Sequence, residues 1–79
     1  MKAIVTVGLK PGVLDVQGKA VANALQGLGF AGVADARVGK VIELELAGDD
    51  RDQAAAAVKD LCEKLLANTV IESYRFEIV

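Results

Sequence analysis

The sequence contains no histidine, no tryptophan and only one cysteine, Cys62. Without histidine the chain lacks the side chain that most often acts as a general base or metal ligand, and nothing activates the Cys62 thiol. A lone cysteine cannot form an internal disulfide, so we expect a reducing, cytoplasmic location. These shortages argue against catalysis on this chain and favour a structural role for Cys62 in the core.

Aromatic residues and positive charge are also scarce. The chain has one tyrosine and two phenylalanines, and its formal net charge is −2. Nucleic-acid binding favours a basic surface with aromatic platforms, so we expect no nucleic-acid partner. The apolar run at the N-terminus stops at Lys10-Pro11, too soon for a signal peptide or a membrane span, so we also expect no membrane partner.

Apolar residues, in contrast, are abundant, at 53% of the 79 residues. A chain of this length forms one domain, here residues 1–79, and buries only about 60% of the surface of its unfolded state. Small domains often complete their cores against other chains. The sequence therefore predicts a homodimer or a higher oligomer.

The spacing of the apolar residues predicts five elements. Alternation indicates strands at 2–9 and 70–79, and helical spacing indicates helices at 15–28 and 50–67. The stretch 34–46 is extended, either as one long bent strand or as two strands that break at Gly39-Lys40.

Each predicted helix has one apolar face. On the first helix this face consists of Leu14, Gly18, Val21, Leu25 and Leu28. On the second it consists of Ala54, Val58, Leu61, Cys62 and Leu65. Segregated apolar faces predict an α+β fold, a two-layer sandwich of order β-α-β(β)-α-β with both helices on one face of an antiparallel or mixed sheet. The other sheet face mixes apolar and charged residues, which suits dimerisation through the sheet or by exchange of the C-terminal strand.

The connection between the first strand and the first helix has unusual residues. Pro11 restricts the backbone, Gly12 permits a tight turn, and Asp15 suits a helix N-cap. Gly18 lies inside the helix, where it costs about 1 kcal/mol relative to alanine, so it indicates close approach of another backbone segment. We interpret 10–12 as a rigid docking turn. A phosphate site at this helix N-terminus is the alternative.

Three further charged groups allow a functional or a purely structural interpretation. Arg37 and Lys40 flank Gly39, either as a solvated turn or as a contact site for an acidic surface. The acidic turn at 49–52 is expected to cap a helix, and Glu43 with Glu45 to meet cations, so no metal site is predicted.

Several of these segments together resemble one family. They are Val5-Thr6-Val7, Leu9-Lys10-Pro11-Gly12-Val13-Leu14-Asp15, Gln17-Gly18-Lys19-Ala20-Val21, Leu28-Gly29-Phe30, Arg37-Val38-Gly39-Lys40 and Glu43-Leu44-Glu45-Leu46. The chain resembles PurS, the small-subunit family of phosphoribosylformylglycinamidine synthase, over nearly its whole length. It departs at Val16, where the family often has proline, a residue that would preorganise the same helix start.

The resemblance implies a place in purine biosynthesis. The complex converts formylglycinamide ribonucleotide, ATP and glutamine to formylglycinamidine ribonucleotide. A large synthetase subunit binds ATP and Mg²⁺, a glutaminase subunit releases ammonia, and the small subunit joins them with no cofactor or catalytic residue of its own. The residues expected to contact these partners are Lys10, Pro11, Gly12, Asp15, Gly18, Arg37, Gly39 and Lys40. The alternative function is a free-standing regulatory domain that binds a small metabolite.

Overall fold

The computed structural model describes all residues from 1 to 79 as an open antiparallel sheet with two helices. The elements in chain order are β1 (Lys2–Leu9), α1 (Val16–Gly27), β2 (Lys40–Glu45), α2 (Arg51–Leu61), the π-helical turn η1 (Cys62–Leu66) and β3 (Glu72–Ile78). The predicted α+β class and order of elements are confirmed. Within the extended stretch 34–46 only β2 pairs as a strand and 34–39 forms none, so both alternatives, one long bent strand and two strands, are wrong.

The sheet has the order β2-β1-β3, and both pairings are antiparallel. Val5 in the central strand lies opposite Ile42 on one side and opposite Phe76 on the other. Because side chains alternate between the faces of a strand, this register places all three on the same face of the sheet. That face carries the core.

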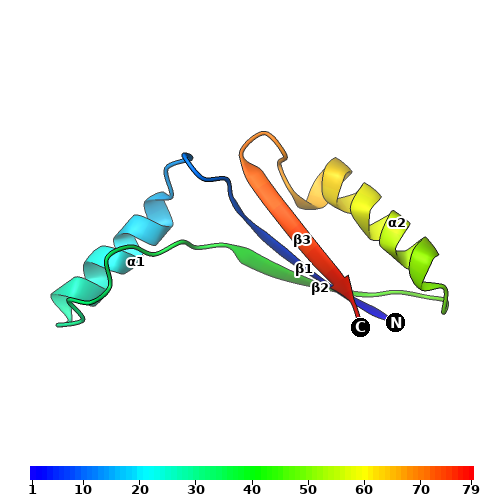
Figure 1. Cartoon of the computed structure of the whole chain (residues 1–79), viewed down its shortest axis with the longest axis horizontal. Helices are drawn as coiled ribbons and strands as arrows, with labels where there is room; N and C mark the ends of the chain where they lie inside the picture. The colour runs from blue at the N-terminus through cyan, green and yellow to red at the C-terminus, as the bar shows by residue number, and fades with distance from the viewer.

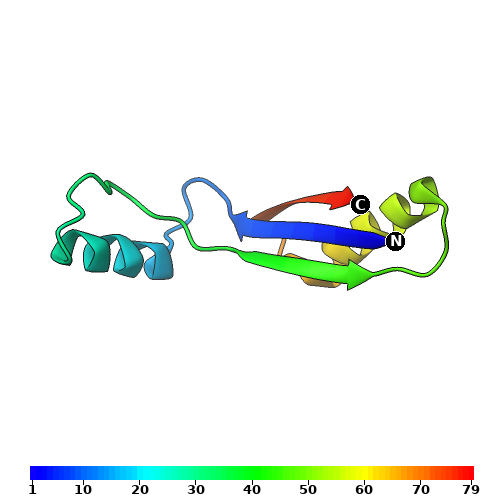
Figure 2. The same ribbon diagram turned by 90° about the horizontal axis from the view of Figure 1, so that it is seen from below.

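The helix α2 and the turn η1 cover the core face of the sheet (Figures 1 and 2). The fully or nearly buried apolar cluster consists of Ala3, Val5, Val7, Val58, Cys62 and Ala67. Burial raises the pKa of the Cys62 thiol, so the protonated form is favoured and the cysteine behaves as a small apolar core residue. Neither helix has the length and apolar composition needed to cross a membrane.

The second helix begins as predicted but ends differently. The Asp50 carboxylate caps it, accepting hydrogen bonds from the backbone N–H groups of Asp52 at 3.0 Å and Gln53 at 3.2 Å. Its last turn widens, because the N–H of Ala67 donates to the carbonyl of Cys62, five residues earlier. The extra residue moves Ala67 into the core and leaves Leu65 76% exposed. Leu61, before the widened turn, is exposed as well, so the predictions of a buried Leu61 and a buried Leu65 are wrong.

The first helix does not lie on the face of the sheet, so the prediction of both helices on one face is wrong for the single chain. It projects beyond the end of the sheet and covers neither face, which gives the molecule extents of 49 × 24 × 14 Å (Figures 1 and 2). Its predicted apolar face is largely exposed, with Leu14 at 72% and Leu28 at 74%, and only Gly18 and Ala22 on α1 are buried. The physical reason lies in the connections that hold α1, described below.

The small core makes each buried side chain important for stability. Replacing the fully buried Val58 with alanine should lower the free energy of unfolding by about 2 kcal/mol, because apolar contacts are lost and a cavity remains. Substitution of its exposed neighbour by Lys59→Ala is the control and should change stability by less than about 0.5 kcal/mol. Urea unfolding at one fixed protein concentration measures both. Equal midpoints for the two variants would contradict this description of the core.

Candidate functional site

The connection from β1 to α1 begins with a tight turn. The N–H of Val13 donates to the carbonyl of Lys10 at 3.1 Å, and Gly12 between them has a φ of +88°. Pro11 before such a glycine is typical of a type II turn, so the two residues have the roles predicted for them. The N–H of Lys10 donates to the carbonyl of Ile71 at 2.8 Å, which attaches the turn to the loop before β3.

The Asp15 carboxylate connects two segments that are distant in the sequence. Its Oδ1 accepts from the N–H of Gly18 at 2.7 Å, which caps α1 as predicted. Its Oδ2 accepts from the N–H of Val38, also at 2.7 Å, in the connection that returns from α1 to β2. The hydrogen bonds from Gly18 and Val38, with the nearby Arg37 charge, lower the pKa of Asp15 despite its burial. The ionised carboxylate, 7% exposed, therefore acts as a structural link.

The Arg37 side chain connects the same two segments in the opposite direction. Its Nη2 donates to the carbonyls of Leu9 and Lys10, each at 3.2 Å, and its Nη1 donates to the carbonyl of Val13 at 3.3 Å. A planar guanidinium with several fixed donors is well suited to span carbonyls of a turn. Arg37 thus holds the turn of its own chain, a role that the sequence did not indicate.

Two glycines allow these segments to approach closely. A Cβ on Gly18 would collide with the carbonyl oxygen of Ala36, which explains why this helix contains glycine there. A Cβ on Gly39 would lie 2.5 Å from the carbonyl oxygen of Val7. The close approach predicted at Gly18 is thus confirmed, and Gly39 has an equivalent role beside β1.

We call the two segments 10–18 and 36–40, with these contacts, the junction. Its contacts bring together Asp15, Gly18, Arg37 and Gly39, and the same two segments also contain Lys10, Pro11, Gly12 and Lys40. Lys10 and Lys40 are exposed, and neither forms an ion pair within the chain. A hollow of about 240 Å³ beside the junction is lined by Asp15, Lys40 and other residues.

Glu72 also lines that hollow and was missed by the sequence analysis. Its Oε1 accepts from the N–H of Asn68 at 2.7 Å, and the Asn68 Oδ1 accepts from the N–H of Val70 at 3.2 Å. The pair organises the loop that receives the Lys10 hydrogen bond through Ile71.

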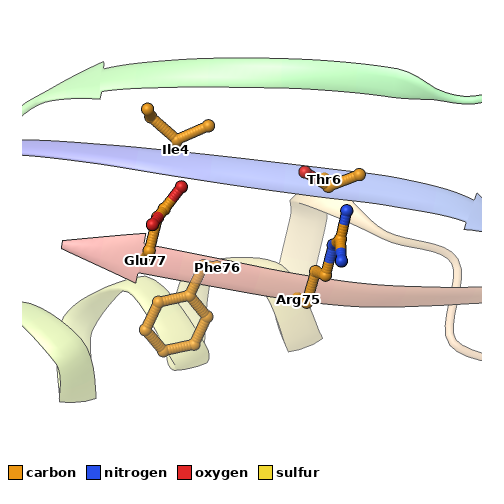
Figure 3. A pocket seen from close by; sticks show the side chains of 5 residues that line it. All are labelled: Ile4, Thr6, Arg75, Phe76 and Glu77. Atoms are coloured by element: carbon orange, nitrogen blue, oxygen red, sulfur yellow. The ribbon is translucent and has the colours of Figure 1, made fainter. Parts of the chain in front are cut away.

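A second hollow, of about 330 Å³, lies across β1 and β3 and is lined by Ile4, Thr6, Arg75, Phe76 and Glu77. Figure 3 shows Arg75 and Glu77 on the sheet face away from α2, while the Phe76 ring points to the side that α2 covers. The charged and apolar mixture predicted for the open face is therefore present. No group of three or more histidine, cysteine, aspartate or glutamate side chains is arranged to hold a metal ion. Both hollows are lined by charged side chains, which could form ion pairs with a binding partner.

Adding a methyl group at Gly18 tests the close approach at the junction. In an ordinary helix interior, Gly→Ala gains about 1 kcal/mol of stability. At position 18 the new Cβ meets the Ala36 carbonyl, so Gly18→Ala should instead cost about 1–3 kcal/mol. Gly27→Ala is the matched control, since nothing lies within 4 Å of its Cβ, and it should be neutral or stabilising. Thermal unfolding of both variants distinguishes the cases, and a stabilised Gly18→Ala would contradict the contact.

The ionised Asp15 carboxylate makes stability depend on pH. Because its folded pKa lies below the ordinary value of 3.8, its contribution is complete above that value and is lost as pH falls through the folded pKa. Asp15→Asn should be less stable at neutral pH and should lose less stability on acidification. Urea unfolding from neutral pH to about pH 2 measures this difference. Parallel curves for the two proteins would show that Asp15 is not the linked group.

Comparison with known proteins identifies relatives along almost the entire chain. The family model PurS, described as phosphoribosylformylglycinamidine (FGAM) synthase, matches residues 2–79. The FGAM synthase subunit PurS of Bacillus subtilis strain 168 is 52% identical over 77 residues, covering 98% of this chain and 90% of that protein.

Solved structures agree with the family model. A crystal structure of B. subtilis PurS has a TM-score of 0.85 at 53% identity, covering 96% of this chain and 94% of that one. A structure described as PurLQS from Thermotoga maritima contains a chain with a TM-score of 0.89 at 31% identity, covering 99% of this chain and 95% of that one. Both the sequence and the open, extended fold therefore assign the chain to the PurS family.

Proposed function

We propose that this chain is the non-catalytic assembly subunit of an FGAM synthase, where it joins the synthetase and glutaminase subunits. The reaction converts formylglycinamide ribonucleotide, ATP and glutamine to formylglycinamidine ribonucleotide. In this proposal ATP and Mg²⁺ bind to the large partner subunit, and the complex works in the cytoplasm. The PurLQS structure, whose PurS-like chain has the same fold, supports an assembly role.

The observation that carries this proposal is the amount of apolar surface left uncovered. Only 9 of the 79 residues are buried, although 53% of the residues are hydrophobic. Large contiguous apolar surfaces on small proteins mark interaction sites. The large apolar side chains that are at least 40% exposed are Leu14, Val16, Val21, Leu28, Phe30, Val41, Leu61, Leu65, Val70, Ile71 and Val79. Neighbouring chains are needed to cover them.

A second copy of this chain accounts for part of that surface. The apolar residues of α1 have no partner within the chain, because α1 lies beyond its own sheet (Figure 1). The apolar face of α1 is suited to packing against the face of a sheet, and a second copy of the chain supplies both such a sheet and such a helix. A homodimer or higher oligomer thus completes the small core.

The free cations at the junction are the contacts we propose for an acidic surface of a partner enzyme. Lys10 and Lys40 are exposed and unpaired, and the turn and the glycines hold their backbone in place. Arg37 contributes differently from Lys10 and Lys40, since its donors already bind carbonyls of its own chain. Charged groups at the rim of an interface act mainly on association rate and orientation.

The rival function, binding of a small metabolite for regulation, predicts an enclosed ligand site. The largest hollow, about 330 Å³ on the open sheet face, is lined by only five residues (Figure 3). Small-molecule sites usually bury most of the ligand surface in a cleft. Calorimetry of the purified chain with amino acids and nucleotides tests the rival directly, and tight binding would favour it.

Reversal of one junction charge tests the proposed assembly. Lys40→Glu should weaken association with the partner enzymes by about tenfold or more, because like charges would then face each other. The chain is titrated into the synthetase and glutaminase subunits while glutamine-dependent product formation is measured. The variant should need a higher concentration for half-maximal activity and reach the same maximum.

Lys59→Glu is the matched control, since Lys59 is an exposed, unpaired cation on α2 away from the junction. It should titrate like the native chain. If Lys40→Glu also titrates like the native chain, the docking role of Lys40 is wrong. If the native chain adds no glutamine-dependent activity at any concentration, the assembly function itself is overturned.

A further inference from the structure

The structure raises the question of what keeps α1 away from its own sheet. Residues 10–39 form an arm, made of α1 and the two connections that join it to β1 and β2 (Figure 1). The sequence pattern alone is satisfied if this arm folds back so that α1 covers a face of its own sheet. In the structure the arm extends instead, and its apolar face is left for another molecule.

Arg37 and Asp15 form five side-chain hydrogen bonds at the junction, and four of them join segments that are distant in the sequence. Arg37, on the returning connection, donates to the carbonyl of Leu9 at the end of β1 and to the carbonyls of Lys10 and Val13 on the outgoing connection, at 3.2–3.3 Å. Asp15, on the outgoing connection, accepts from Val38 on the returning one and from Gly18 at the start of α1, both at 2.7 Å. The bonds therefore join the base of the arm to the first turn of α1.

The backbone contacts at the same place restrict bending further. Gly18 lies directly against the Ala36 carbonyl, and Gly39 lies against the carbonyl of Val7 in β1. The Lys10 N–H is bonded to Ile71, so the turn is also attached to the loop before β3. A change in the angle of the arm would break several of these contacts at once.

We propose that Asp15 and Arg37 are positioning residues that brace the arm in its extended direction, so that α1 packs against a second copy and not against its own sheet. The contacts at the junction decide which of these two arrangements the chain adopts. This inference rests on the proposed function only in requiring a homo-oligomer. It assigns to the junction a role separate from contact with the partner enzymes.

The bracing role of Asp15 and Arg37 concerns the direction of the arm, and it is separate from the stability of the folded sheet and α2. The buried cluster that holds the sheet to α2, including Val5, Val58 and Cys62, lies outside the junction. Loss of the brace should therefore leave the sheet and α2 folded while the arm changes direction. Because both chains of a pair must extend their arms, the apparent association constant between copies falls in proportion to the square of the fraction of chains that still hold the competent direction.

The direction of the arm can be measured within a single chain. One spin label is placed on α1 by Asn23→Cys and one on α2 by Lys59→Cys, both at exposed positions, while Cys62 is fully buried and protected from labelling. Labelled chains are diluted into excess unlabelled chains, so that pulsed electron resonance reports the distance within one chain. The braced protein should give one narrow distribution at long distance.

Arg37→Ala should broaden this distribution toward shorter distances and raise the dissociation constant of the homo-oligomer by about tenfold, if roughly one chain in three still extends, because both chains of a pair must be extended. Asp15→Asn is the milder second variant, and Arg37→Lys should fall between, since an ammonium cannot span three carbonyls. Lys19→Ala is the control, because the Lys19 side chain on α1 forms no hydrogen bond or ion pair, and it should match the native chain.

An unchanged distance distribution in both Arg37→Ala and Asp15→Asn would overturn the brace. Circular dichroism of each variant confirms that the sheet and α2 remain folded before the distance is interpreted. If Arg37→Ala does not fold, Asp15→Asn and Arg37→Lys decide the outcome. A native chain that is monomeric by sedimentation, yet gives a narrow long distance, would contradict the homo-oligomer while leaving the bracing role intact.

Discussion

The two oxygens of the Asp15 carboxylate bind two different backbone segments, and the placement of α1 relative to the sheet depends on this division. One oxygen accepts a hydrogen bond from the N–H of Gly18, which has no partner within the first turn of α1. The other oxygen accepts from the N–H of Val38, in the connection that leads to β2. A charged acceptor with short bonds to backbone donors is among the stronger hydrogen-bonding groups in proteins. Its position therefore fixes where α1 starts relative to where β2 begins.

The Arg37 guanidinium completes this arrangement from the other side. It donates to the carbonyls of Leu9, Lys10 and Val13, which lie before and at the end of the turn at Pro11-Gly12. Together with the glycine contacts, the two charged side chains turn a pair of flexible connections into a rigid unit. A rigid base allows α1 to stand away from the sheet without support from apolar packing in its own chain.

A chain of this size gains from such a design. Its own core is limited to a few valines and alanines with Cys62, so further stabilisation must come from surfaces shared with other copies. An extended arm offers more shared surface than a compact domain of equal length. The same exposed, ordered surfaces suit a subunit whose role is to hold larger enzymes together, as expected for the PurS family.

Much of the local structure could be predicted from sequence. Alternation identified β1 and β3 to within two residues, and the caps at Asp15 and Asp50 were correct because capping is a local interaction. The need for close approach at Gly18 was also visible, since glycine in a helix interior is otherwise unfavourable. The exposed Leu65 was not predictable, because a single widened turn at Cys62–Leu66 shifts the buried face.

The sequence by itself determined the elements, their apolar faces and the residues that cap and turn the chain, since these depend on neighbours within a few positions. The direction of α1, the partners of Arg37 and the second acceptor role of Asp15 were decided only by the tertiary structure. Arg37 binds carbonyls 24–28 residues away, and Asp15 binds an N–H 23 residues away. No periodicity encodes such pairings, because they exist only after the strands have brought the two connections together.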